Sequence, residues 1–315
     1  MLVLGALSLS LGRADLDNLT LRSTLLRLRG IRLVAAFMVG AALAVGGVIV
    51  QGLFRNPLVS PSILGTTGGA SLGGQLAIIG LNAILARQLF HIAPELILPF
   101  GCLGGALIAL FILLVVGRVY SGPLVFLLVG FTLSSLFLAA GALATSIAQD
   151  SWDLGRAVVA FTLGGLGGVG KQQVLMALPL TIFGIIAAWF WGRSIDLLLS
   201  GEEEAASLGV NVAQVRRWGI IWTALLTAAA VSLCGNIGFV GLVVPHALRP
   251  WIGANHRRLI PVAALAGGTF LVACDLLTRI LPGRTHVPLG VVTGLVGAPL
   301  FLLLILKQRR ELLHG

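Results

Sequence analysis

Long apolar runs separated by short polar segments make up most of this chain. The runs are continuously apolar and do not alternate with polar residues, which favours helices over the strands of a membrane barrel. A helix needs roughly 20 apolar residues to cross the hydrocarbon of a bilayer, and most of the runs approach that length. The pattern predicts ten spans, at residues 1–11, 31–54, 63–85, 96–117, 123–148, 174–191, 218–235, 237–251, 259–280 and 287–306.

Two apolar segments do not fit a regular span. Residues 1–11 are too few to cross about 30 Å at about 1.5 Å per residue, so either the start codon has been placed late or the bilayer is thinned there. Residues 157–169 are short and glycine-rich, which indicates a partial or re-entrant helix covered by protein or water. We therefore expect an all-α, polytopic membrane helix bundle of about ten spans plus one short partial helix, as a single domain over residues 1–315.

Composition agrees with an integral membrane protein. The chain is 57% hydrophobic and 10% charged, against roughly 45–50% and 25% in soluble domains. Its net charge of +10 comes from basic residues placed singly or in pairs between apolar runs, so lipid headgroups are the expected partner and nucleic acid is not. Cys102, Cys234 and Cys274 lie inside apolar segments without ligand spacing, which indicates packing roles.

Charge also bears on orientation. Four predicted spans separate the polar segment 200–217 from the C-terminus, which places both on one side of the membrane. That side carries 11 basic residues and the other carries 10, but five of those ten lie in the loop after the first span. Without that loop the ratio is 11 to 5, which favours a cytoplasmic 200–217 segment and two cytoplasmic termini. The arginine cluster in the excluded loop needs its own explanation.

The segment 200–217, SGEEEAASLGVNVAQVRR, is a charged island in an otherwise apolar chain, and we expect a cytoplasmic docking loop over 193–217. Glu202, Glu203 and Glu204 would favour the N-terminus of a helix, because acids there complement its dipole. Gly209 would allow a turn between two short helices. The alternative is an ordinary solvated loop.

The chain offers little chemistry for catalysis. It has no paired carboxylates, no metal-ligand spacing and no nucleophile beside a base, so neither an enzyme nor a cofactor is predicted. The run from Gly165 to Gln172 fits G-x-x-x-x-G-K but lacks the final Ser or Thr and a preceding strand, which argues against phosphate binding. Asp275, the acid within the predicted spans, could relay protons. We favour its pairing with Arg279, four residues on.

Several short motifs stand in order along nearly the whole chain. They are Gln51-Gly-Leu-Phe-Arg-Asn56-Pro57-Leu with Gly65, then Leu208-Gly209-Val210, then Gly238-Phe-Val-Gly-Leu-Val-Val-Pro245-His246 with Arg249, and finally Pro288-Leu-Gly290-Val-Val-Thr293. Together they resemble the FecCD-type permeases, which are the membrane subunits of binding-protein-dependent ABC importers for iron siderophores, haem and cobalamin. The resemblance implies ten helices per subunit and a location in the inner (plasma) membrane.

The resemblance also implies partners. These are a second permease subunit, identical or homologous, two cytoplasmic ATPase subunits, and a periplasmic or lipid-anchored substrate-binding protein. The island would then supply the family's coupling helices, through Glu202, Glu203, Glu204, Ser207, Leu208, Gly209 and Val210.

Arginines on the other face match a second part of the family pattern. Arg29, Arg32 and Arg279 correspond to arginines that would hold acidic side chains on the lobes of the binding protein. Contact with lipid headgroups is the alternative interpretation.

Two functions therefore compete. The first is the permease of an ABC importer for a metal chelate, with iron siderophore or haem ahead of cobalamin. The second is a secondary transporter or channel that works without ATP. The sequence does not name the substrate, because in the first architecture the binding protein selects it.

Overall fold

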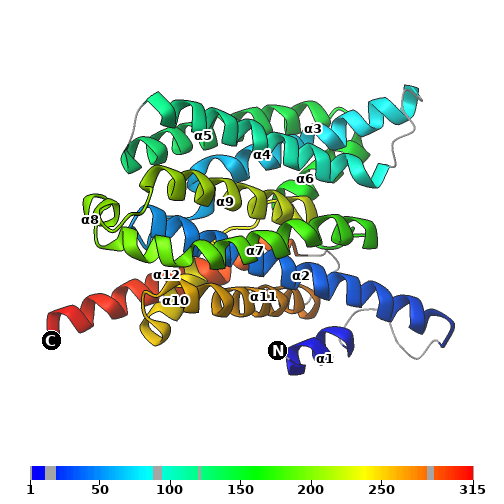
Figure 1. Ribbon diagram of the computed structural model, residues 1–315. Coiled ribbons are helices and arrows are strands. Elements are labelled where there is room, and N and C mark those ends of the chain that lie inside the picture. The colour runs from blue at the N-terminus through cyan, green and yellow to red at the C-terminus, as the bar shows by residue number, and fades with distance from the viewer. Residues whose placement is uncertain (1, 11–18, 88–93, 120–121, 282–286, 315) are drawn as a thin grey trace.

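The computed structural model describes residues 2–10, 19–87, 94–119, 122–281 and 287–314, and all regular structure in these ranges is helical (Figure 1). The elements are α1 (Leu2–Ser10), α2 (Leu19–Leu53), the 3-10 helix η1 (Pro61–Leu64), α3 (Thr66–Arg87), α4 (Pro94–Val119), α5 (Pro123–Ala148), α6 (Trp152–Leu163), α7 (Lys171–Leu199), α8 (Glu202–Ser207), α9 (Val212–Cys234), α10 (Val240–Ile252), α11 (His256–Ile280) and α12 (Leu289–His314).

The membrane helix bundle is confirmed, but the count of ten spans is not. Seven helices of the described chain are long and apolar enough to cross a bilayer, namely α2, α4, α5, α7, α9, α11 and α12. Helices α1 and α10 have only 9 and 13 residues. Helix α3 has 22 residues but is not among these seven. These three correspond to the predicted spans 1–11, 237–251 and 63–85.

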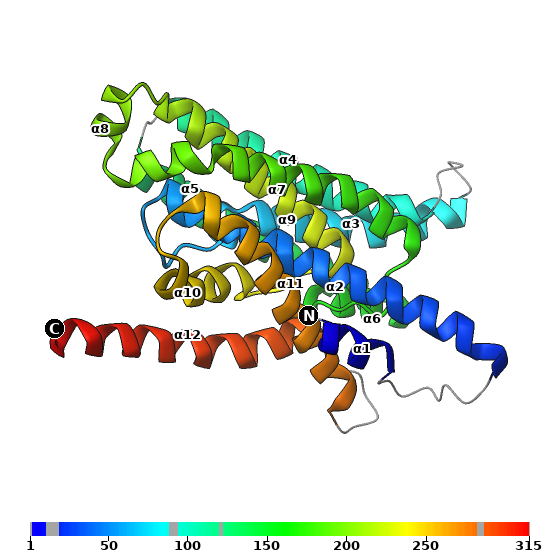
Figure 2. The ribbon, with the colours of Figure 1, turned by 60° about the horizontal axis from the view of Figure 1, so that its bottom comes forward.

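The helices divide into a core and a periphery. In α2, 83% of the most apolar stretch is buried inside the protein, whereas the corresponding share in α5 and in α12 is 22%. Helices α9 and α11 resemble α2, and α4 and α7 resemble α5. Figures 1 and 2 show α2 and α9 running through the middle of the bundle. The peripheral helices therefore present apolar faces that fit lipid or another protein.

Glycines bring pairs of helices into close contact. A Cβ atom at Gly69 or Gly73 of α3 would collide with the carbonyl of Gly105 or Gly101 of α4, so the four-residue spacing acts as a small-residue seam. Gly65 serves differently. It ends η1 with a φ of 78°, and a side chain there would press on Leu133 of α5.

Two predicted boundaries are wrong. The partial helix predicted over 157–169 is α6, which ends at Leu163 because Gly164 takes a φ of 75° and a glycine-rich loop follows. The loop predicted over 193–217 shrinks to residues 200–211, because α7 continues to Leu199 and α9 starts at Val212. Ile195 and Leu198 are buried in the core and extend the apolar face of α7 beyond its continuous apolar run.

Candidate functional site

The charged island forms a compact projection at one end of the bundle. Helix α8 starts with Glu202, Glu203 and Glu204, so three carboxylates occupy its first turn, where the free backbone N–H groups favour negative charge. The helix ends in a Schellman motif, because Gly209 N–H donates to Ala206 O and Val210 N–H donates to Ala205 O, both at 3.0 Å. Gly209 has the required positive φ of 84°.

Helix α8 is fastened to its neighbours at two points. Arg216 Nη2 on α9 donates to Glu202 Oε1 at 2.6 Å, and the side chain of Ala205 is fully buried. Ser207 Oγ donates to Glu204 O at 2.7 Å, inside α8 itself. The second short helix expected after Gly209 is absent from the described chain as a separate element, because Asn211 caps the long helix α9 by accepting from Gln214 N–H.

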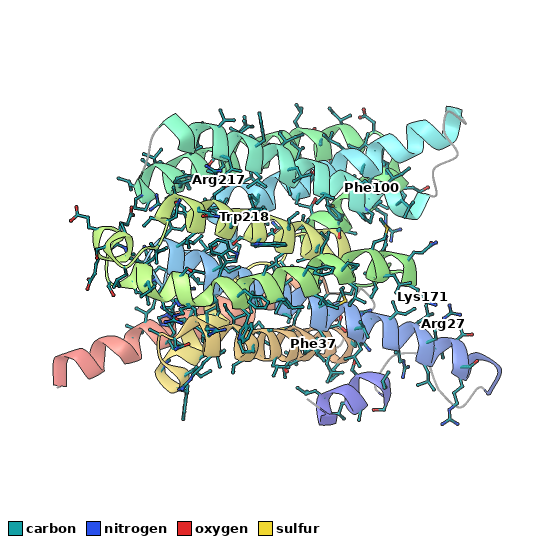
Figure 3. All side chains as sticks on the ribbon, viewed as in Figure 1. Arg27, Phe37, Phe100, Lys171, Arg217 and Trp218 are labelled. Atoms are coloured by element: carbon teal, nitrogen blue, oxygen red, sulfur yellow. The ribbon has the colours of Figure 1, made fainter. Side chains whose placement is uncertain are left out.

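The exposed part of the island offers both charge and apolar surface. Glu203, Glu204, Ser207 and Arg217 are exposed, and 61% of Leu208 is accessible. Figure 1 shows α8 beyond the ends of α7 and α9, and Figure 3 shows Arg217 on the first turns of α9. Helix α8 is therefore attached to α9 and carries both charged and apolar side chains on its exposed surface.

The three predicted docking arginines gather at the opposite end of the bundle, where α1, α2 and α11 meet. Arg32 donates to Asp275 Oδ1 through Nε at 2.9 Å and through Nη2 at 2.7 Å. Arg279 Nη2 donates to Asp275 Oδ2. The expected pairing of Asp275 with Arg279 is confirmed, and Arg32 joins it from 243 residues away in the sequence. Asp275 is 1% exposed, so both arginines neutralise a buried carboxylate.

The same arginines also hold α1. Arg29 Nη1 donates to Leu9 O at 2.8 Å and Ser10 O at 2.9 Å, and Arg279 Nη1 donates to Ser8 O at 2.9 Å. These carbonyls belong to the last turn of α1, which has no intrahelical donors for them. Arg29 is 8% exposed, so the three arginines mainly form an internal clamp that holds α1 and Asp275. Of the two arginines that contact Asp275, Arg32 has the more accessible side chain.

The motif residues cluster around the turns that join the core helices. Gln51 is buried and bridges two elements, since it accepts from Arg249 Nη2 at 2.9 Å and donates to Gly241 O at 3.4 Å. Asn56 Oδ1 accepts from Leu58 N–H at 2.9 Å and so shapes the turn that exposes Pro57. These contacts therefore fix the turn that follows α2 and the position of α10 against α2.

The remaining motif residues lie where α12 packs against α10 and where its start meets the end of α6. Pro245 and His246 are buried in α10, and the His246 ring meets the edge of Phe301 on α12 at 5.5 Å between centroids. Pro288 immediately precedes α12, and a Cβ atom at Gly290 would lie 2.8 Å from Asn236 O. Leu289 N–H donates to Gly164 O at 2.9 Å, which joins the start of α12 to the end of α6.

One polar pair escaped the sequence interpretation. Asp196 Oδ1 on α7 accepts from the backbone N–H of His256 at 2.8 Å and lies 2.6 Å from its Nδ1. The predicted span ended at 191, so Asp196 counted as a loop residue and His256 as a scattered histidine. Their common position at the α8 end of the bundle depends on α7 extending to Leu199, which continued helical periodicity could have indicated.

Comparison with known proteins agrees with this architecture. Residues 1–307 match the model of the FecCD transport family. The chain is 37% identical to the Fe(3+) dicitrate transport system permease protein FecD of Escherichia coli, over 88% of this chain and 83% of that protein. It is 40% identical to the hemin transport system permease protein HmuU of Yersinia pestis, over 91% and 84% of the two chains.

A third relative and two solved structures extend the comparison. The cobalamin import system permease protein BtuC of Halobacterium salinarum is 38% identical over 87% of this chain and 71% of that protein. A solved inward-facing ABC transporter of metal-chelate type superposes with a TM-score of 0.84 at 31% identity, covering 97% and 95% of the chains. PsaBC of Streptococcus pneumoniae shares the fold, with a TM-score of 0.58 at 19% identity over 91% and 95%. This chain belongs to the FecCD transport family of ABC importer permeases.

Proposed function

We propose that this chain is the membrane-spanning permease subunit of an ABC importer that moves a metal chelate across the inner membrane, with ATP hydrolysed by separate subunits. The family match over residues 1–307 supports this role. The relatives are named for ferric dicitrate, hemin and cobalamin, so each of these three chemistries is a candidate cargo.

The observation that carries the proposal is the geometry of α8. A permease whose ATP is hydrolysed by a separate subunit needs a surface through which that subunit can move the spanning helices. Helix α8 is exposed, stands between α7 and α9, and is fastened to α9 by the Arg216–Glu202 ion pair. We assign Glu202, Glu203, Glu204, Ser207, Leu208, Gly209 and Val210 to contact with an ATPase subunit.

A second permease subunit and a binding protein complete the assembly we propose. Helix α5 exposes Leu128, Phe131 and Leu138, and polar residues lie on its adjacent face. Lipid cannot form hydrogen bonds with these polar groups, so a protein partner or water must cover that face. At the opposite end, Arg32 is the arginine best placed to meet an acidic binding protein, and Arg29 and Arg279 would support it through the clamp.

Reconstitution tests the function directly. The permease, its ATPase subunits and its binding protein are assembled in proteoliposomes, and uptake of the loaded chelate is followed with and without ATP. We expect uptake only when ATP and the ATPase subunits are both present. Uptake by liposomes that contain the permease alone would refute this role and favour a secondary transporter or channel.

A further inference from the structure

A polar cleft runs along the exposed side of α3 and α5. It has a volume of about 450 Å³ and reaches from η1 to the ends of α5 and α6. None of its lining residues is an Asp, Glu, Lys, Arg or His, so the described wall is polar but uncharged. We call it the α3–α5 cleft, and its polar lining includes Thr67, Ser71, Gln75, Ser134, Thr145, Ser146, Gln149 and Thr162.

Gln75 supplies an acceptor that nothing in the described chain satisfies. The residue is 3% exposed, and its Nε2 donates to Thr162 Oγ1 at 2.8 Å. Thr162 Oγ1 donates its own proton to Val158 O. It can therefore only accept from Gln75, which means that the Nε2 end of the Gln75 amide faces Thr162. The other end, Oε1, is buried without a partner. A buried acceptor in this state is costly unless water or a ligand donates to it.

The opposite wall leaves room for that oxygen. Gly141 of α5 has no side chain, and a Cβ atom there would lie 2.8 Å from Gln75 Oε1. Nearby hydroxyls donate to backbone carbonyls, Thr145 to Gly141 O at 2.8 Å and Ser134 to Gly130 O at 2.9 Å. Thr145 and Ser134 therefore face the cleft with free lone pairs, like Gln75.

We propose that the α3–α5 cleft binds a face of the transported chelate and prefers a ligand whose periphery carries neutral N–H or O–H donors over one that carries carboxylates. A donor can satisfy Gln75 Oε1, whereas a carboxylate would meet fixed acceptors and lose its hydration without a cation to replace it. This inference rests on the proposed function, since it assumes that a chelate passes the cleft. Of the three relatives' cargoes, cobalamin carries amide side chains, while ferric dicitrate and hemin carry carboxylates.

The neighbouring groove offers a contrast within the same chain. It lies between α3 and α4, has a volume of about 620 Å³, and is lined by glycines and apolar side chains such as Leu76, Phe100 and Ile108. Phe100, which Figure 3 labels near the start of α4, is exposed. The groove lacks the buried unpartnered acceptor of the α3–α5 cleft, so it provides a control position.

Cysteine protection tests the preference on the full-length permease in nanodiscs. Ser146, an exposed lining residue, is changed to Cys, and its alkylation by a maleimide is timed with cyanocobalamin, hemin or ferric dicitrate present. Cys102, Cys234 and Cys274 are buried and should react slowly. We expect cyanocobalamin to protect at lower concentration than either carboxylate ligand, and none of them to protect Gly104→Cys in the apolar groove.

Variants at Gln75 decide whether its oxygen is responsible. Gln75→Leu should raise the half-protecting concentration of cyanocobalamin about fivefold, as expected for one lost hydrogen bond. Gly141→Ala, which crowds Oε1, should act like Gln75→Leu and replaces it if that variant does not fold. Equal protection by all three ligands, or protection unchanged in both variants, would overturn the inference. ATP-driven uptake is scored separately, so its presence or absence bears only on the proposed function.

Discussion

At the scale of single residues, Asp275 is a buried carboxylate that requires charged partners. It is 1% exposed and receives hydrogen bonds from Arg32 and Arg279. A proton relay would need this carboxylate to release its partners, whereas two guanidinium groups hold it through hydrogen bonds. The sequence pointed to the nearer arginine because helix spacing is local, but it could not reveal Arg32, whose contact depends on how α2 packs against α11.

Neutralising this carboxylate should destabilise the protein. Asp275→Asn leaves two arginines facing a buried group without charge, which we expect to cost about 3 kcal/mol. Thermal unfolding in detergent would show the loss, and Glu203→Gln, an exposed change on α8, should alter stability by no more than about 0.5 kcal/mol. Equal stability of the two variants would mean that the clamp is not a structural unit.

At the scale of elements, α1 depends on side chains from other helices. It has nine residues, and Arg29 and Arg279 supply donors to the carbonyls at its end. Isolated helices of this length are unstable in water, so its position relies on these contacts. The hydrophobic pattern predicted an apolar segment here but not its anchoring, since hydrogen bonds from distant residues leave no periodic signal.

Removing one anchor should therefore release α1. Ser8 is 1% exposed, so a Ser8→Cys reporter is expected to react slowly with maleimide. Adding Arg29→Gln should speed its alkylation by about tenfold or more, as roughly 1.4 kcal/mol of lost contact would. Arg27→Gln, an exposed neighbour on α2 that Figure 3 labels, is the matched control and should leave the rate unchanged. Equal rates in the two double variants would show that Arg29 does not hold α1.

At the scale of the whole molecule, motif order predicted the family, and hydropathy predicted the helical membrane fold. Boundaries were less predictable, because Gly164 stops α6 early and Ile195 and Leu198 extend α7 through packing that a hydropathy window does not detect. The α3–α5 cleft could not be predicted, since Gln75 and Gly141 come together only when α3 packs on α5.

The topology remains a prediction with a direct check. Four predicted spans between residues 200–217 and the C-terminus place Ser207 and His314 on one side of the membrane. Cysteine at either position should be labelled by a membrane-impermeant maleimide only from the cytoplasmic side. Labelling of the two from opposite sides would contradict the parity.

The central claim is that α8 and its glycine turn couple a separate ATPase to this permease, and Gly209→Val tests it most directly. Valine at a φ of 84° should cost about 1–3 kcal/mol of local strain and misplace α8. Gly168→Val, in a loop where a Cβ atom meets nothing within 4 Å, is the control. In the reconstituted complex we predict that Gly209→Val inserts normally but loses uptake and substrate-stimulated ATP hydrolysis together, while Gly168→Val keeps both. Full uptake by Gly209→Val would contradict the coupling role.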